Sequence, residues 1–272
     1  IIGKRSRCAN ALMENAVYTD ILSHLPVPSP NYYGMLEETN GRFCWLFLED
    51  AGEQGSFRLN GEHRELAAQW LGLMHTSATH LSAPACLLDK GPSHYLKRLQ
   101  LGRNGILENL VNLAHLGGQL APLETIVHQF DLLESHWDRV EAFCEGAPHT
   151  LIHGDFAARN LRVRNDQAGM ALLPFDWGEA GWGVPAVDIM QVDVLSYSSS
   201  VHGHWPWLDL HAIQRLAIVG KIFRCLDAVY WQLPSFKYQW LKVPIYNMGI
   251  YASRLADAIR GAGLSSAAGS IG

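Results

Sequence analysis

One segment decides the fold of this chain: Leu151-Ile152-His153-Gly154-Asp155-Phe156-Ala157-Ala158-Arg159-Asn160-Leu161. It contains the pattern HGDxxxxN, and the apolar residues on both sides of the pattern are typical of short strands. Further along, Pro174-Phe175-Asp176-Trp177-Gly178 again places an aspartate directly after an apolar strand. We therefore expect Asp155 and Asp176 to reach one cleft from the ends of neighbouring strands, with Asn160 beyond a loop that turns back toward it.

This combination of side chains fits the chemistry of phosphoryl transfer. A carboxylate must orient the attacking hydroxyl and accept its proton, while other oxygen ligands hold Mg²⁺ against the nucleotide phosphates. All of these groups need a rigid support, because positioning and charge neutralisation supply most of the rate. Asp155, Asn160 and Asp176 are oxygen donors without a cysteine or histidine among them, a set that suits Mg²⁺ rather than zinc.

The two motifs together resemble the aminoglycoside phosphotransferase and choline kinase superfamily, which is related to the protein kinases. The resemblance implies that Asp155, Asn160 and Asp176 form the catalytic centre. Asp155 would be the catalytic base, and Asn160 and Asp176 would hold Mg²⁺. It also implies that His153 supports the catalytic loop without acid–base chemistry, and that Asp188, in the segment 178–189, braces the same loop.

The resemblance extends to the nucleotide side of the site. Ile2-Gly3-Lys4 resembles the strand that carries a phosphate-binding lysine, and Glu14 resembles the ion-pair partner of that lysine. The segment that contains Leu48, Glu49 and Asp50 resembles the linker whose backbone receives the adenine ring. An alternative for Lys4 is an exposed basic residue. Arg159 has two equal interpretations, as a residue that contacts phosphate or a carboxylate, or as a solvated loop arginine.

The same resemblance implies that part of the family's fold precedes residue 1. The family begins with two strands joined by a loop that covers the nucleotide phosphates. If Lys4 is the phosphate-binding lysine, those strands are missing from this chain. We therefore consider two functions: an ATP- or GTP-dependent phosphotransferase that acts on a hydroxyl of a small molecule, and a non-catalytic kinase-like module that binds a nucleotide or small molecule.

The pattern along the chain predicts an α+β, bilobal, protein-kinase-like fold. Residues 1–54 are the expected truncated, β-containing N-lobe with its hinge, and residues 55–272 the large, mainly helical C-lobe with the catalytic loop and acceptor pocket. Asn40-Gly41 indicates a hairpin turn, and Asn60 a helix N-cap. We expect strands at 31–37, 42–48, 150–153, 161–163 and 171–175, a frayed tail from residue 261, and helices at 9–25, 60–80, 94–101, 104–116, 122–144, 186–198, 208–232 and 236–260.

Composition excludes several other classes of protein. The 272 residues carry a formal net charge of -5 without a basic stripe, which argues against a nucleic-acid partner. No apolar run is long enough to span a bilayer and no secretory signal opens the chain, so we expect no membrane partner. The five cysteines lie far apart without a CxxC pair, which predicts free thiols in a reducing cytoplasm.

The phosphate acceptor is left open between an aminoglycoside, an amino alcohol and a sugar. Acidic residues are few after position 190, whereas a polycationic acceptor favours a pocket rich in carboxylates. Aromatic residues are frequent there, which would suit a quaternary amine or an apolar hydroxyl compound. An equally simple interpretation is that these aromatic residues pack helices together: Trp205, Trp207, Tyr230, Trp231, Phe236, Tyr238, Trp240, Tyr246 and Tyr251.

Overall fold

The computed structural model describes residues 1–52, 56–166 and 169–264. The chain divides into two compact units, Ile1–Asp89 with Gly146–Gln214, and Lys90–Glu145 with Arg215–Gly272. The mixture of small sheets and helices confirms the predicted α+β class. The predicted boundary at residue 54 lies outside the described residues, and the division into lobes at that point stays a prediction.

The first unit begins with an antiparallel sheet in the order β1-β3-β2, formed by β1 (Ile2–Arg7), β2 (Tyr32–Glu37) and β3 (Phe43–Leu48). In this register Lys4 lies opposite Leu46, so its side chain is on the face that Cys44, Leu46 and Leu48 bury. The predicted hairpin is confirmed. Gly41 turns at φ 66°, and its N–H donates to the carbonyl of Glu38 at 2.8 Å.

The predicted helix over 9–25 is three shorter pieces. The α-helix α1 (Cys8–Ala16) continues into a π turn, η1 (Val17–Ile21), and then a 3-10 turn, η2 (Leu22–His24). The wider π turn places Val17, Tyr18 and Ile21 together on the buried side. A simple helical period does not anticipate this change of turn.

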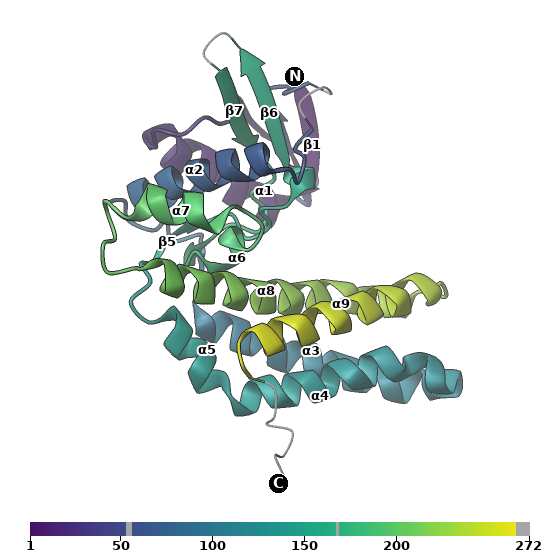
Figure 1. Cartoon of the computed structure of the whole chain (residues 1–272). Helices are drawn as coiled ribbons and strands as arrows, with labels where there is room; N and C mark the ends of the chain where they lie inside the picture. Colours follow the sequence, from purple (N-terminus) through teal and green to yellow (C-terminus); the bar gives the residue numbers. More distant parts are fainter. Residues whose placement is uncertain (53–55, 167–168, 265–272) are drawn as a thin grey trace. The chain divides into compact units, whose positions relative to one another are not determined.

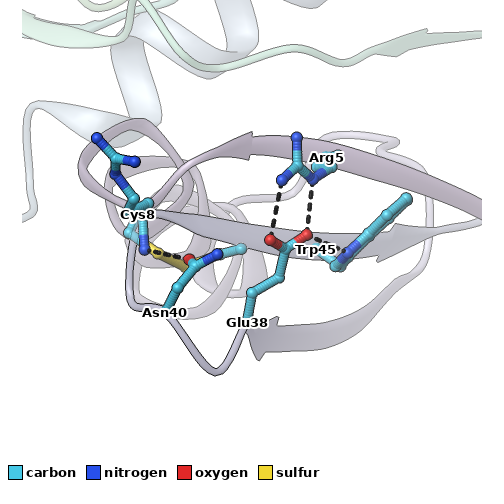
Figure 2. The surroundings of a disulfide bond; sticks show 7 residues. Arg5, Cys8, Glu38, Asn40 and Trp45 are labelled. Carbon is cyan, nitrogen blue, oxygen red and sulfur yellow. Dashed lines mark hydrogen bonds and ion pairs between the residues drawn. A yellow bond between two sulfur atoms is a disulfide. The ribbon is translucent and has the colours of Figure 1, made fainter.

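The prediction of free thiols throughout the chain was wrong, because Cys8 and Cys44 form a disulfide bond (Figure 2). Cys8 begins α1, and Cys44 lies opposite Ser6 in the pairing of β1 with β3. Beside the bond, Glu38 accepts hydrogen bonds from Arg5 at 2.6 and 2.9 Å and from the Trp45 indole at 3.0 Å. The pairing depends on strand register across 36 residues of sequence, so the spacing of cysteines did not reveal it.

The rest of the first unit carries the HGDxxxxN segment and the segment around Asp176 between short strands. As predicted, Asn60 caps the long helix α2 by accepting from the N–H of His63 at 3.0 Å. The predicted helix over 186–198 is two helices, because Asp193 caps the second one through the N–H of Ser196. The elements are α2 (Gly61–Ala78), β4 (Leu88–Asp89), β5 (Thr150–Ile152), β6 (Leu161–Asp166), β7 (Gly169–Pro174), β8 (Gly181–Gly183), α6 (Ala186–Ile189) and α7 (Val194–Val201).

Two small sheets position these motifs. Strands β6 and β7 form an antiparallel hairpin, in which Leu161 lies opposite Pro174 (Figure 1). Strand β8 joins β5 on one side and β4 on the other. The HGDxxxxN loop therefore runs from the end of β5 to the start of β6, and the second motif follows directly after β7. Strand β6 reaches Asp166 and β7 begins at Gly169, with residues 167–168 outside the described part.

The second unit is a bundle of long helices (Figure 1). The helices predicted at 94–101 and 104–116 are one helix, in which Gly102 gives room to Phe130: an added Cβ would come within 3.0 Å of that ring. The predicted helix 122–144 is two helices that meet at His136. The elements are α3 (Pro92–Asn112), η4 (Ala114–Leu120), α4 (Ala121–Ser135), α5 (Trp137–Cys144), α8 (Leu210–Gln232, which begins in the first unit), η6 (Leu233–Lys237) and α9 (Lys242–Gly261).

Contacts between side chains hold these helices together. Tyr95 of α3 stacks on Phe223 of α8 with ring centroids 3.8 Å apart, and Gln129 of α4 donates to the carbonyl of Ala252 in α9 at 2.9 Å. Within the described residues, no helix combines the length and the hydrophobicity that crossing a membrane requires. The tail predicted to fray from Gly261 lies, from residue 265 on, outside the described part.

Candidate functional site: the loop between β5 and β6

A buried aspartate holds the backbone of the HGDxxxxN loop. Asp188 of α6 accepts hydrogen bonds from the N–H groups of His153 at 2.7 Å and Gly154 at 2.9 Å. Gly154 adopts φ 77°, a left-handed conformation in which glycine carries no steric penalty. Burial raises the pKa of Asp188, but His75 and the loop N–H groups outweigh this effect, so its pKa lies below its usual value. Asp188 is thus an ionised brace beneath the loop.

His153 has the partners of a neutral imidazole. Its Nδ1 lies 3.3 Å from the N–H of Asp155, which can only donate, and its Nε2 lies 3.1 Å from the carbonyl oxygen of Phe175, which can only accept. These partners place the proton on Nε2. Full burial lowers the pKa of His153 despite the nearby carboxylate of Asp188. A neutral ring that bonds backbone on both sides fits the predicted supporting role.

Asp155 and Asn160 lie together at the end of the loop. The amide nitrogen of Asn160 donates to Oδ2 of Asp155 and to its carbonyl oxygen, both at 2.9 Å. The guanidinium of Arg159 also bonds Oδ2 of Asp155. The Asp155 side chain is 12% exposed, and that of Arg159 is 61% exposed. Asp155 is thus a carboxylate that the protein holds in one orientation while its partner Arg159 faces solvent.

Asp176 joins the nucleotide side of the site through Lys4. The ammonium of Lys4 lies 2.5 Å from Oε1 of Glu14 and 2.6 Å from Oδ1 of Asp176. Burial lowers the pKa of Lys4, but the two carboxylates outweigh it, so the pKa lies above its usual value and the side chain is charged. The Glu14 side chain is fully buried, and this burial raises its pKa. The alternative of Lys4 as an exposed basic residue is wrong, because its side chain is only 28% exposed and joins two carboxylates.

The backbone at Asp176 has an unusual conformation. Asp176 has φ 67° and is the one non-glycine residue with positive φ in the part of the chain that the structure describes. Such left-handed conformations are uncommon outside glycine and gather at functional sites. The turn directs the carboxylate toward Lys4, whereas the preceding Phe175 donates its N–H to the carbonyl of Asn160 at 3.0 Å. Asn160 and Asp176 therefore flank the same end of the β6–β7 hairpin.

The predicted linker residues have structural partners of their own. Leu48 ends β3 and is buried on the face that also carries Lys4. The N–H of Glu49 donates to the carbonyl of Asn31 at 2.8 Å, and its carboxylate accepts from Arg164 at 2.6 Å. Asp50 accepts from the N–H of Gly52 at 2.9 Å. No interaction found in the described residues joins Glu49 or Asp50 to Lys4, so their place at the nucleotide stays a prediction.

The side chains at this end of the hairpin fit a magnesium ion. Asn160 uses its amide nitrogen for Asp155, so its amide oxygen is the atom suited to a cation. Asp176 is 43% exposed and already holds a cationic group, the ammonium of Lys4. Two protein oxygens are the usual share of a Mg²⁺ site that phosphates and water complete. Among the described residues no cluster of three or more histidine, cysteine and acidic side chains offers a different metal site.

Sequence reasoning missed the support beneath the brace. His75 of α2 lies 3.4 Å from Oδ2 of Asp188, and its other ring nitrogen lies 2.9 Å from the hydroxyl of Tyr197 in α7. His75 lies in the helix that the sequence predicts over 60–80, but no motif marks His75 or Tyr197 as support for Asp188. Only the packing of α2 against α7 brings the two residues together. The sequence therefore predicted the helix that carries His75 but not the contact of His75 with Tyr197.

Three acidic residues of the expected acceptor lobe have structural partners, whereas its aromatic residues are divided between buried and exposed positions. Asp193 and Asp209 cap helices, through the N–H groups of Ser196 at 2.8 Å and Ala212 at 2.7 Å. Asp227 is fully buried with Arg98 Nε at 3.3 Å. Of the aromatic residues, Trp205 and Phe236 are buried, and four are exposed: Trp207, Tyr238, Trp240 and Tyr246. Packing explains only some of the aromatic content.

Comparisons with known proteins agree with this arrangement. The fold is similar to a GDP complex of an aminoglycoside 2'-phosphotransferase-IIIa variant, with 15% identity, a TM-score of 0.62, and coverage of 93% of this chain and 83% of that chain. It is similar to a microcompartment-associated aminopropanol kinase, with 15% identity, a TM-score of 0.62, and coverage of 95% and 84%. A third similar structure, Plasmodium vivax ethanolamine kinase, has 18% identity, a TM-score of 0.54, and coverage of 92% and 71%.

At these identities, similarity of structure shows the fold alone, and no curated protein matches the sequence. The match at the level of the family is more extensive, because it runs over residues 4–205 and includes Lys4, the HGDxxxxN loop and Asp176. It covers well over half of the chain. This chain therefore belongs to the phosphotransferase enzyme family APH and has the predicted protein-kinase-like fold.

Proposed function

We propose that this protein transfers the γ-phosphate of ATP or GTP to a hydroxyl group of a small molecule. The observation that carries the proposal is the ion-pair group in which Lys4 joins the buried Glu14 to Asp176. A buried carboxylate and a partly exposed one around a single ammonium are costly to build. The arrangement is useful where a charged lysine must be held in position to bind nucleotide phosphates, next to a carboxylate that would bind Mg²⁺.

Each residue has a distinct role in the proposed reaction. Asp155 orients the acceptor hydroxyl and takes its proton as the oxygen attacks the γ-phosphorus, and the nucleoside diphosphate leaves. Lys4 contacts the nucleotide phosphates and Glu14 keeps it in place. Asn160 and Asp176 would hold Mg²⁺, which would neutralise charge on the phosphates. His153 and Asp188 keep the loop rigid, so that Asp155 does not need to be reordered in each turnover.

The acceptor class follows from the similar structures only as a proposal. Their names include an aminoglycoside phosphotransferase, an aminopropanol kinase and an ethanolamine kinase, so amino sugars and amino alcohols are the first acceptors to test, with neutral sugars next. A nucleoside triphosphate donor implies the cytoplasm as the location. Three solved structures of similar fold are GDP complexes and another is an ADP complex, which supports the search for a nucleotide but does not select between ATP and GTP.

The test is a transfer assay with γ-labelled ATP and GTP against a panel of aminoglycosides, amino alcohols and sugars. We expect label in at least one acceptor and a requirement for Mg²⁺. In D176N the Mg²⁺ concentration for half-maximal activity should rise, or activity should disappear. An unchanged Mg²⁺ titration would count against the ligand role of Asp176. Nucleotide binding without transfer to any acceptor or to water would favour the alternative, a non-catalytic binding module.

A further inference from the structure

Arg159 has a contact that a solvated loop arginine does not need. Its guanidinium bonds Oδ2 of Asp155, four residues earlier, although 61% of the arginine side chain is exposed. An exposed ion pair contributes little to stability, because water solvates both charges and holding a long side chain costs entropy. The partner here is different from the usual surface partner. Asp155 is only 12% exposed, so the arginine reaches from solvent to a largely covered carboxylate.

The contact is part of a fixed local arrangement. Ala158–Asn160 form a 3-10 turn, and consecutive residues of this turn, Arg159 and Asn160, bond the same carboxylate oxygen of Asp155. The carbonyl oxygen of Arg159 accepts from the guanidinium of Arg162 at 3.2 Å. Arg162 in turn lies over the ring of Phe175, with its guanidinium carbon 5.0 Å from the ring centroid. The backbone that carries Arg159 is therefore tied to the hairpin that ends at Asp176.

We propose that Arg159 is a positioning residue for the phosphoryl transfer, a role that rests on the function proposed above. With Asn160 it holds the Asp155 carboxylate in a single orientation, from a turn whose geometry the hairpin fixes. Two donors on Oδ2 restrict rotation of the carboxylate more than the Asn160 amide does alone, and such rotation would misdirect the carboxylate from the acceptor hydroxyl. Loss of orientation lowers the rate of the chemical step rather than the affinity for the nucleotide.

This role differs from that of a merely structural arginine in what a substitution changes. Removal of a structural arginine would lower stability and reduce all activities through loss of folded protein. Removal of a positioning arginine would lower kcat and leave both the nucleotide KM and the melting temperature nearly unchanged. Because the Arg159 side chain is mostly exposed, its removal also opens a space that a small guanidinium ion can enter from solvent.

The experiment compares R159A and R159K with wild type. The readouts are the rate of ATP or GTP hydrolysis and the rate of phosphoryl transfer to any acceptor that the panel identifies. R260A is the matched control, because Arg260 makes the same kind of exposed pair with Asp257 in the other unit. We expect R159A to lower kcat by about 10- to 100-fold with the nucleotide KM within about threefold. R159K should retain more activity than R159A, and added guanidinium ion should restore part of the rate of R159A.

The outcomes separate this inference from the proposed function. A wild-type protein that transfers no phosphoryl group to any acceptor or to water overturns the proposed function, and this role of Arg159 with it. An active wild type whose R159A variant keeps its kcat overturns the role of Arg159 alone. A loss of rate in R159A that parallels a lower melting temperature and that guanidinium ion does not restore also overturns it. R260A should behave as wild type throughout.

Discussion

His153 and Asp188 are fully buried at the centre of the candidate site, and both form hydrogen bonds with backbone groups. Their contacts with backbone fix peptide groups of the loop and of Phe175, and Asp188 is in turn in contact with the ring of His75. Such buried groups are costly to leave without a partner, so they hold the loop in one geometry. In the proposed function, Asp155 is thereby placed by residues that take no part in the chemistry.

Burial of His153 predicts a dependence of stability on pH. Its folded-state pKa lies below the ordinary value of 6.5, so in mildly acidic solution the unfolded chain binds a proton that the folded chain does not. This contribution to stability is complete above the unfolded pKa and is lost as pH falls toward the folded pKa. We expect the free energy of unfolding of wild type to fall below about pH 6.5, with a slope of up to about 1.4 kcal/mol per pH unit from this group.

The measurement is urea unfolding between pH 7.5 and 5, for wild type and H153N. Other groups titrate in the same range, and the difference between the two proteins isolates His153. H153N should be less stable at neutral pH and should show a smaller acid slope. Equal slopes in the two proteins would mean that His153 is protonated, or becomes accessible, in the folded state.

A second residue-scale prediction concerns the pair of Lys4 and Glu14. K4M leaves the fully buried carboxylate of Glu14 without its ammonium, and an uncompensated buried charge is strongly destabilising. We expect K4M to lower the free energy of unfolding by about 2–4 kcal/mol. The double variant K4M/E14Q removes both charges and should recover part of this loss in urea unfolding. If the double variant is no more stable than K4M, the loss of stability in K4M does not come from the uncompensated charge of Glu14, which would contradict the prediction.

At the scale of elements, the disulfide between Cys8 and Cys44 connects the start of α1 to the middle strand of the first sheet. Closing a loop of this length restricts the unfolded chain, and the expected gain is up to about 4 kcal/mol. Because α1 carries Glu14 and β3 pairs with β1, the strand of Lys4, the bond also ties the helix of Glu14 to the sheet that carries Lys4. The disulfide therefore favours the arrangement in which Lys4 forms its ion pair with Glu14.

We expect C8S/C44S to unfold at lower urea concentration than wild type, and a reducing agent to have the same effect on wild type. C86S is the control, because Cys86 is an exposed free thiol, and it should not change the unfolding curve. Titration of thiols in the protein unfolded in urea without a reducing agent should find the three free cysteines and not five. Five titratable thiols, or a C8S/C44S curve that coincides with that of wild type, would contradict the disulfide.

Local signals in the sequence were sufficient where one residue determines an element. The Asn40-Gly41 hairpin and the Asn60 cap are of this kind. They were insufficient where tertiary contacts decide. The break of the first helix into α, π and 3-10 turns depends on which side is buried, and the continuity of α3 through Gly102 depends on the ring of Phe130. The disulfide likewise depends on a strand register that the spacing of cysteines does not contain.

For the site, the motif residues that sequence reasoning selected lie in two connected groups, Asp155 with Asn160 and Lys4 with Glu14 and Asp176. The motifs predicted Lys4 with Glu14, and Asp155, Asn160 and Asp176 at one cleft, because residue type and spacing reflect what the chemistry requires. The ion pair of Lys4 with Asp176 was not predicted. Tyr197 was not predictable, because it supports His75 only through the packing of two helices. The pairing of Arg159 was one of two equal interpretations, and only side-chain geometry selects between them.

At the scale of the whole molecule, the chain keeps the fold of the family at identities of 15–18% to the solved structures named above. Such low identity means that the positions which specify the acceptor are free to differ. The acids that a polycationic acceptor would need are engaged in helix caps and in the buried pair of Asp227 with Arg98. We therefore expect acceptors with few positive charges to be better substrates than polycationic aminoglycosides, which the panel assay measures as kcat/KM for each acceptor.

The central claim is that Asp155 is the base of a phosphoryl transfer to a small hydroxyl compound. The most direct test measures kcat and the nucleotide Kd side by side for wild type and D155N, which keeps the size of the side chain. We predict a loss of at least about 10³-fold in kcat, with the Kd within about threefold, because Asp155 acts on the acceptor and not on the nucleotide. A D155N variant that retains turnover close to that of wild type would contradict the account.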